Sequence, residues 1–257
     1  DFNTLNFGGR REDGTTPYRL GDQDLSLFFG QSSFSQYVVT RASNAVVVDP
    51  EVDLTLLGPL GCGIQTGSGT VLNRLKPVVG ESLVVFGCGA VGLSAIMAAK
   101  LTGCSQIIAV DIHASRLALA GELGATHQIN GKEQDAVAVI KQITGKGAHY
   151  AVETTGVSAI VLQAVHAVKP LGTVAIVGFT GDITLNVQND LMAEGKSLVG
   201  VIEGDAVPAL FIPLLVQLYK QGKFPIDKLI ARYPLADINQ AFADSASGKV
   251  IKPVVVM

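Results

Sequence analysis

The central part of the chain alternates short apolar runs, rich in β-branched residues, with longer segments of helical periodicity. The apolar runs predict strands at 83–86, 106–110, 127–129, 150–153, 173–177 and 197–202. The segments between and after them predict helices at 91–101, 114–123, 135–143, 159–168 and 187–193. Strands that alternate with helices, and are too apolar to face water, predict a six-stranded, doubly wound parallel α/β sheet covered by helices on both faces.

The two flanks of this region show a different pattern. Residues 1–35 are rich in Gly, Asp, Asn, Ser and Arg and predict loops, whereas the apolar runs 37–39 and 45–48 predict antiparallel strands. The glycine-rich segment 61–69 reads as a loop, with a helix expected after it. Beyond the sixth strand we expect a helix at 206–220, a strand at 229–233, a helix at 237–245 and a strand at 253–257. These flanking elements predict parts of a second domain.

Composition narrows the classes of partner and compartment. The 257 residues include 19 Lys and Arg against 22 Asp and Glu, a net charge of −3, with no basic block that would bind nucleic acid or an anionic membrane. Only 16% of the residues are charged, which favours buried sheets or an oligomer. The uncharged stretch 82–99 has the length of a membrane span, but its glycines and its change of periodicity argue against one. Three cysteines without a CxxC pair favour a reducing cytoplasm.

The motif Gly87-Cys88-Gly89-Ala90-Val91-Gly92 lies directly after the first predicted strand of the sheet and opens a helix. In this GxGxxG pattern Gly87 permits a tight turn, Gly89 lets a diphosphate approach the backbone, and Gly92 permits close packing of helix on strand. Asp111 ends the next strand, about 20 residues further, where an acidic residue binds the adenosine ribose. The combination predicts a Rossmann dinucleotide site; the alternative is a glycine turn that only tightens a strand-to-helix junction.

Asp111 also bears on the choice of cofactor. A carboxylate there accepts hydrogen bonds from both ribose hydroxyls and repels a 2′-phosphate, which favours NAD over NADP. Arg116, five residues further, weakens this preference because an arginine can bind such a phosphate. The alternative for Arg116 is a solvated charge on a helix.

Cys62 stands between Gly61 and Gly63, where a metal or ligand can approach the backbone. A small buried hydrophobe remains the commoner role of a lone cysteine, and we assign that role to Cys88 and Cys104. The histidines show no metal-ligand spacing and receive no catalytic role; they are His113, His127, His149 and His166.

Four segments together resemble the zinc-dependent, medium-chain alcohol dehydrogenase family. They are 57–67 (LGPLGCGIQTG), 87–94 (GCGAVGLS), Val110-Asp111 and 219–225 (YKQGKFP). Within the family these residues are most similar to those of the benzyl (aryl) alcohol dehydrogenases, and the resemblance extends over essentially the whole chain after residue 28.

The resemblance implies roles for individual residues. Cys62 corresponds to the third protein ligand of the catalytic zinc, and Thr66 to a catalytic-site residue on the nicotinamide face away from substrate. Val91 corresponds to the residue that pushes the nicotinamide toward the zinc. Ile112 corresponds to one wall of the adenine slot, and Lys252 to a basic residue that reaches the diphosphate.

The nicotinamide carboxamide would be held by the turn at Val177 and Gly178 and by the backbone near Val201 and Glu203. The full set of expected cofactor-binding residues is Thr66, Gly87, Gly89, Ala90, Val91, Gly92, Asp111, Ile112, Arg116, Val177, Gly178, Val201, Glu203 and Lys252.

The same resemblance implies that 1–63 is part of a mostly β, GroES-like catalytic domain, 64–202 the NAD-binding domain, and 203–257 a return to the catalytic domain. The first zinc cysteine, the zinc histidine and the proton-relay hydroxyl of the family are missing, so we expect the chain to be the C-terminal portion of such an enzyme.

The implied reaction is NAD-dependent oxidation of a primary, aromatic alcohol to its aldehyde by zinc-assisted hydride transfer. The implied assembly is a homodimer or homotetramer joined through the sixth strand. The alternatives are an inactive dinucleotide-binding module, a zinc-free reductase, and an alcohol dehydrogenase with aliphatic or other substrates.

Overall fold

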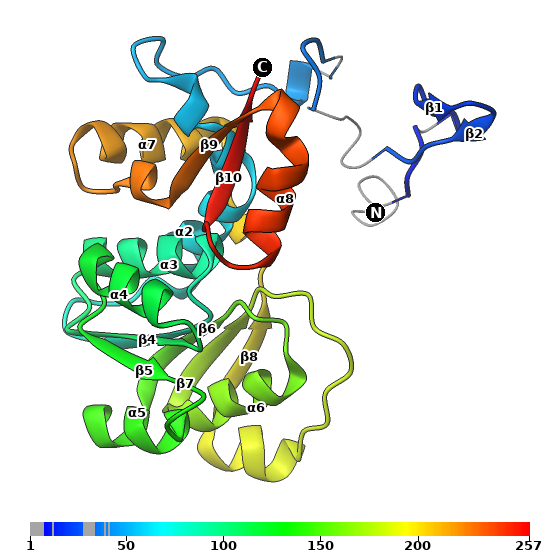
Figure 1. Ribbon diagram of the computed structural model, residues 1–257. Coiled ribbons are helices and arrows are strands. Elements are labelled where there is room, and N and C mark those ends of the chain that lie inside the picture. Colours follow the sequence, from blue (N-terminus) through cyan, green and yellow to red (C-terminus); the bar gives the residue numbers. More distant parts are fainter. Residues whose placement is uncertain (1–7, 12, 28–33, 39, 41) are drawn as a thin grey trace.

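The computed structural model describes residues 8–11, 13–27, 34–38, 40 and 42–257, and is built around a six-stranded parallel sheet (Figure 1). The strand order is β5-β4-β3-β6-β7-β8. The bounds are β3 Ser82–Phe86, β4 Gln106–Asp111, β5 His127–Asn130, β6 Ala148–Glu153, β7 Val168–Ile176 and β8 Ser197–Gly200. All six predicted strands are confirmed, and the order is that of the doubly wound dinucleotide-binding fold. β7 begins earlier than predicted, at Val168, because its pairing with β6 continues across a register shift between Ala148 and Tyr150.

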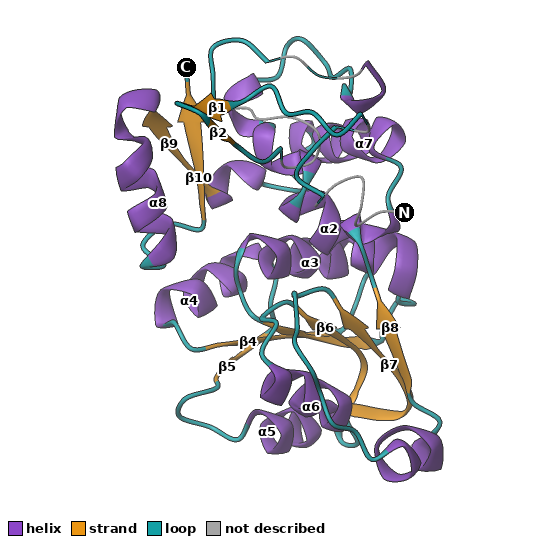
Figure 2. Cartoon of the chain, turned by 90° about the vertical axis from the view of Figure 1, so that its right-hand side faces the viewer, coloured by secondary structure: helices purple, strands orange, loops and turns teal. Residues whose placement is uncertain are grey.

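Helices cover both faces of this sheet (Figures 1 and 2). Their bounds are α2 Gly63–Gly69, α3 Ala90–Leu101, α4 Ala114–Leu123, α5 Ala136–Thr144 and α6 Ser158–Ala167. Leu83 and Val85 of β3 pack in one apolar core with α3 and α4, while Val84 and Phe86 pack in the other with α5 and α6. Because β3 is buried on both faces, its sequence shows a continuous apolar run rather than an alternating one.

The glycine-rich segment predicted as a loop is the buried helix α2, which continues as a π-helical turn over Thr70–Leu75. A Cβ at Gly67 would lie 1.9 Å from the carbonyl oxygen of Val91, and one at Gly69 would lie 2.4 Å from that of Gly204. The glycines therefore allow backbone-to-backbone packing, which outweighs their cost of about 1 kcal/mol each in a helix.

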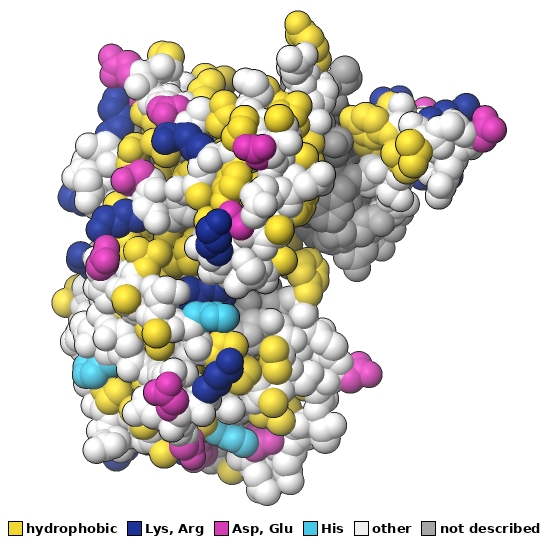
Figure 3. All heavy atoms as spheres, in the orientation of Figure 1, with side chains coloured by type: hydrophobic (Ala, Val, Ile, Leu, Met, Phe, Trp, Pro, Cys, Tyr) yellow, Lys and Arg dark blue, Asp and Glu magenta, His cyan; other side chains and the backbone are white. Residues whose placement is uncertain are grey.

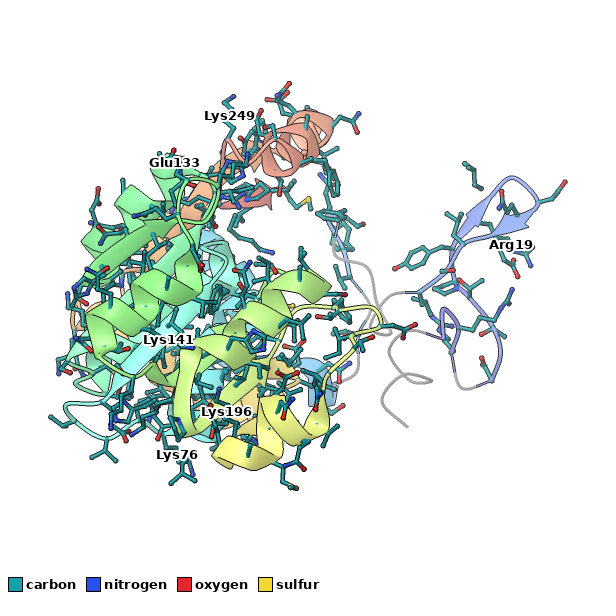
Figure 4. All side chains as sticks on the ribbon, turned by 90° about the horizontal axis from the view of Figure 1, so that it is seen from below. Arg19, Lys76, Glu133, Lys141, Lys196 and Lys249 are labelled. Atoms are coloured by element: carbon teal, nitrogen blue, oxygen red, sulfur yellow. The ribbon has the colours of Figure 1, made fainter. Side chains whose placement is uncertain are left out.

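The predicted strands before residue 50 are not present among the described residues: 34–38 form bends and 45–48 have no strand partner, while Val39 lies outside the described residues. Val46 and Val48 pack against the main apolar core while Val47 is 91% exposed, so the apolar pattern reflects this one-sided packing without a sheet. The short hairpin β1 Arg19–Leu20 and β2 Gln23–Asp24 stands where loops were predicted. It lies apart from the sheet (Figure 1), and its Arg19 (labelled in Figure 4) pairs with Asp24 at 3.2 Å.

The helix predicted at 187–193 is not a regular α-helix. It consists of a π-helical turn, Val187–Leu191, followed by a 3-10 turn, Met192–Glu194. Asn186 caps the first turn by accepting a hydrogen bond from the Asn189 amide at 3.1 Å. The segment is too short for the apolar periodicity to determine the kind of helix.

After the sheet the chain forms α7 Pro208–Lys220, β9 Ile230–Pro234, α8 Ile238–Ala246 and β10 Lys252–Val256, which confirms the predicted order. β9 and β10 pair in parallel. Asp244 of α8, 5% exposed, accepts hydrogen bonds from Tyr233 Oη of β9 at 2.7 Å and from Lys249 Nζ, after α8, at 2.9 Å. Lys249 is labelled in Figure 4.

The uncharged stretch at 82–99 divides into β3, the glycine turn and the first part of α3. In the described part of the chain, no helix has both the length and the apolar character needed to span a membrane.

A histidine joins β3 to β6 at the end of the sheet where both strands begin. His149 Nδ1 accepts a hydrogen bond from the Ser82 amide at 3.1 Å and lies 2.8 Å from the Ser82 hydroxyl. Because a backbone N–H can only donate, Nδ1 must be unprotonated. Burial, followed by the charge of Lys169, lowers the pKa of His149, while Glu81 opposes this shift.

Since the pKa of His149 is lower in the folded state, the unfolded chain takes up a proton first as the pH falls below about 6.5. The stability that His149 contributes is therefore present above that pH and is lost as the pH falls through the folded-state pKa. We expect His149→Asn, whose Oδ1 replaces Nδ1 as acceptor, to flatten the dependence of urea-unfolding free energy on pH between about 5 and 7. His127→Asn, at an exposed ring bonded to Thr126, is the control; equal slopes in both variants would contradict the assignment.

Candidate functional site

A cavity of about 690 Å³ opens at the carboxyl ends of β3, β4 and β6, where the strand order reverses. Its size is that of a small-molecule or cofactor site, and its position is the usual ligand crevice of an open α/β sheet. It is lined by Cys62, Gly63, Phe86, Gly87, Gly89, Ala90, Val91, Val110, Asp111, Ile112, His113, Arg116, Gly131, Thr154, Thr155, Val157, Ile160, Gln163 and Lys252.

The three glycines of the turn between β3 and α3 differ in what surrounds them. Gly87 has φ +91° and passes close to Thr154, whose Oγ1 would lie 2.6 Å from an added Cβ. At Gly92 a Cβ would lie 1.8 Å from the Gly87 carbonyl oxygen. At Gly89 a Cβ would meet no atom of the described residues within 4 Å, and none of their side chains caps the helix there. The first amides of α3 are thus accessible to an anion past Gly89.

Asp111 ends β4 at the edge of this turn and is 8% exposed. One carboxylate oxygen accepts from the amides of Ile112 (2.7 Å) and His113 (2.8 Å), and the other from the amide of Cys88 (2.7 Å). These three bonds fix the side chain against the glycine turn. Since a carboxylate has about four acceptor positions, one remains for a ligand hydroxyl.

Basic groups from separate elements also line the cavity: Arg116 of α4, Lys252 of β10 and His113. The Nε of Arg116 is buried without a hydrogen-bond partner in the described structure. On the face shown in Figure 3, basic and acidic side chains are dispersed rather than gathered in one patch. Within the cavity, Arg116 and Lys252 supply positive charge, which suits a phosphate group.

Cys62 follows the 3-10 turn Gly58–Gly61 and precedes α2, and its exposed thiol lies on the cavity wall. Partial burial of this thiol is the main cause of its raised pKa. The negative charge of Glu203 also raises the pKa, whereas the positive charge of Lys252 lowers it. Across the described ranges, no three His, Cys, Asp or Glu side chains come together in a way that could hold a metal ion. Cys62 and the described residues around it do not by themselves fit a zinc ion, which needs at least three protein ligands.

The structure brings most, but not all, of the predicted site residues to the cavity. Those that line it are Cys62, Gly87, Gly89, Ala90, Val91, Asp111, Ile112, Arg116 and Lys252. Those that do not line it are Thr66, Gly92, Val177, Gly178, Val201 and Glu203. Thr66 lies within α2 with its hydroxyl bonded to Glu203, and the Val201 amide donates to Ile176 at the end of β7.

Glu153, the last residue of β6, is an element of the site that sequence reasoning missed. Its carboxylate is fully buried and accepts hydrogen bonds from the Thr155 amide (2.7 Å), the Thr155 hydroxyl and the Gly156 amide (3.2 Å). Its carbonyl oxygen accepts from Val177 and Gly178 at 2.9 and 3.1 Å. Glu153 therefore shapes the loop that forms one cavity wall; the available signal was an acidic residue ending an otherwise apolar run.

Comparison with known proteins identifies the family of this chain. The model of the zinc-binding dehydrogenase family matches residues 90–220. Geraniol dehydrogenase of Castellaniella defragrans is 43% identical over 260 residues, which cover 98% of this chain and 69% of that protein.

Solved structures agree over the whole described fold. The crystal structure of an alcohol dehydrogenase zinc-binding domain protein from Burkholderia ambifaria has 50% identity and a TM-score of 0.93, covering 100% of this chain and 70% of that one. Benzyl alcohol dehydrogenase from Acinetobacter calcoaceticus has 48% identity and a TM-score of 0.91, covering 99% and 70%. The glycine turn, the acidic end of β4 and these similarities together establish that the chain belongs to the zinc-binding dehydrogenase family.

Proposed function

We propose that this chain carries the cofactor half of an NAD-dependent alcohol dehydrogenase, which oxidises a primary, aromatic alcohol to its aldehyde by zinc-assisted hydride transfer. The observation that carries the proposal is the single cavity that joins the open glycine turn to Asp111. The names of two similar proteins, geraniol dehydrogenase and benzyl alcohol dehydrogenase, support an alcohol as substrate. The second name supports an aromatic one, and an aliphatic alcohol remains the alternative.

NAD fits the residues that line the cavity. The space beyond Gly89 and the uncapped amides of α3 suit its diphosphate, with Lys252 as a countercharge. The remaining acceptor position of Asp111 suits a hydroxyl of the adenosine ribose, and its charge disfavours a 2′-phosphate. Arg116 has the opposite effect, because an arginine can bind a 2′-phosphate. Bound NAD would supply the hydride acceptor of the reaction.

For the nicotinamide half we propose the residues that the family resemblance implies: Thr66, Val91, the turn at Val177 and Gly178, and the backbone at Val201 and Glu203. Support comes from the fold, since the turn and the last two residues follow the carboxyl ends of β7 and β8. The proposed domains are 1–63, 64–202 and 203–257.

The zinc part of the proposal assigns one ligand, Cys62, and requires ligands from outside the described residues. The second candidate function is a dinucleotide-binding module without catalysis, for which the same cavity would serve.

For the assembly we propose a homodimer or homotetramer joined through β8. This strand ends the sheet, with β7 as its neighbour on one side. Apolar side chains nearby are exposed, with Ile202 at 58% and Val207 at 60%. Pairing with a second copy would cover the strand edge and this apolar surface. The unpaired thiols of Cys62, Cys88 and Cys104 support a reducing cytoplasm as the compartment.

The first experiment measures cofactor and metal on the purified chain. We expect NADH to bind one site per chain with a change in its fluorescence, because the cavity contains the groups that hold a dinucleotide. We expect less than stoichiometric zinc by plasma emission and no oxidation of benzyl alcohol, because no further ligands join Cys62 among the described residues. Failure to bind NAD or NADH would refute the proposal; full zinc content with turnover would refute the account of Cys62.

Asp111→Gly should weaken NAD binding about tenfold relative to NADP, because one ribose acceptor and the repulsion of a 2′-phosphate disappear together. The measurement is the ratio of the two dissociation constants by calorimetric titration. Asp135→Gly removes an equal charge and an equal kind of backbone acceptor, the cap of α5, away from the cavity. An unchanged ratio in the Asp111 variant, or the same change in the Asp135 variant, would contradict the role of Asp111.

The same substitution at two glycines three positions apart separates binding from stability. Gly89→Ala should weaken NADH binding at least about tenfold with little change in the unfolding free energy, because its methyl group enters the cavity and meets no protein atom. Gly92→Ala should instead lower stability by about 2–4 kcal/mol, because its methyl group overlaps the Gly87 carbonyl oxygen. Equal losses of affinity and stability in both variants would show that Gly89 serves the turn alone.

A further inference from the structure

The segment that follows β8 has an unusual backbone. Three consecutive residues, Glu203, Gly204 and Asp205, have positive φ values of 50°, 68° and 48°. The segment packs directly on α2, since a Cβ at Gly204 would lie 2.4 Å from the Gln65 carbonyl oxygen. Asn73 also donates a hydrogen bond to the Gly204 carbonyl at 3.0 Å. These contacts hold Glu203 in a conformation that a non-glycine residue rarely adopts.

The result is a fixed carboxylate. Glu203 Oε2 accepts hydrogen bonds from Gln65 Nε2 at 3.0 Å and from Thr66 Oγ1 at 3.3 Å. Gln65 is 2% exposed, and its Nε2 also donates to the Gly61 carbonyl at 3.0 Å, which sets the orientation of the amide. The charge of the same Glu203 side chain also contributes to the raised pKa of the Cys62 thiol on the cavity wall.

This carboxylate has no countercharge in contact with it. In the described part of the chain, no Lys, Arg or His nitrogen lies within 4.0 Å of Glu203, whereas the neighbouring Asp205 pairs with Arg74 at 3.5 Å. Lys252 also lines the cavity and, at Cys62, acts against the negative charge of Glu203. Since Glu203 is part-buried, its field is screened less than that of a surface charge.

The position of this charge relative to a dinucleotide follows from the fold and rests on the proposed function. Asp111 at the end of β4 takes the adenosine ribose, and the turn at Gly89 takes the diphosphate. The other mononucleotide half then lies across the switch point, over the carboxyl ends of β6, β7 and β8. Glu203 follows β8 directly after Val201 and Ile202, so its carboxylate belongs to that half.

The two redox forms of the cofactor differ in charge at this half, because the nicotinamide ring is positive when oxidised and neutral when reduced. A nearby uncompensated carboxylate attracts the oxidised ring and does not attract the reduced one. We propose that Glu203 is a specificity-determining residue that makes the site discriminate in favour of NAD⁺ against NADH. Its role is electrostatic and does not require contact with the ring.

The test compares dissociation constants for NAD⁺ and NADH, measured by calorimetry on the full chain at one pH and ionic strength. Glu203→Gln keeps the shape and one acceptor oxygen but removes the charge. We expect it to raise the Kd of NAD⁺ about three- to tenfold, and to leave that of NADH within about twofold. Asp205→Asn is the matched control, with the same charge change on the same segment at a carboxylate that already pairs with Arg74. Its ratio of the two constants should match that of the unmodified chain.

A second variant keeps the inference testable if Glu203→Gln is poorly folded. Glu203→Asp retains the charge one methylene further back, so its ratio should remain near that of the unmodified chain. An equal weakening of NAD⁺ and NADH in the Gln variant would overturn the inference, because it would show a structural contact and not discrimination by charge. A large change of the ratio in the Asp or Asp205→Asn variant would overturn it as well. Binding of neither cofactor to the unmodified chain would refute the proposed function itself, which is a distinguishable outcome.

Discussion

Glycine at position 67 lets helix α2 lie directly against the first turn of α3, backbone on backbone. The same helix end meets the segment after β8 through Gly69 and Gly204, again with no side chain between the two backbones. A methyl group at either position would separate the elements by more than a side-chain rearrangement can absorb. The relative placement of the thiol at Cys62, the glycine turn and the end of the sheet depends on this close packing.

This close packing holds the elements that carry the site residues in one shared framework. Helix α3 begins at the glycine turn, α2 begins one residue after Cys62, and the segment at 203–205 begins three residues after β8 ends. Asp111 adds a further connection, since its hydrogen bond to the Cys88 amide ties β4 to the turn. Groups from α2, α3, β4 and the segment after β8 are thus positioned mostly by backbone contacts, which tolerate little displacement.

The sequence predicts the sheet well because its central strands are buried and therefore form short apolar runs, as the uncharged and fully buried β3 shows, with the acidic residues of β4 and β6 only at their last positions. The glycine turn and Asp111 were predictable because their spacing reflects the geometry of a strand-to-helix crossover. Pattern reasoning failed where the outcome depends on distant parts of the chain. The apolar run 45–48 lacks a partner strand in the described structure, and α2 is helical because of what packs against it rather than because of its glycines. The carboxylates of Glu153 and Glu203 were missed, or assigned to the backbone alone, since their hydrogen-bond partners are fixed only by the fold.

At Glu203 the positive φ angle lowers the stability of the folded chain, whereas the carboxylate provides the proposed discrimination between NAD⁺ and NADH. Asn or Gly adopts this backbone conformation more readily than Glu does, and the left-handed conformation of a non-glycine residue costs on the order of 1 kcal/mol. A laboratory selection for heat resistance would therefore favour replacing Glu203, and the replacement would remove the part-buried carboxylate that accepts hydrogen bonds from Gln65 and Thr66 of α2. A stabilised descendant of this chain would gain a higher melting temperature and a cofactor site less sensitive to redox state.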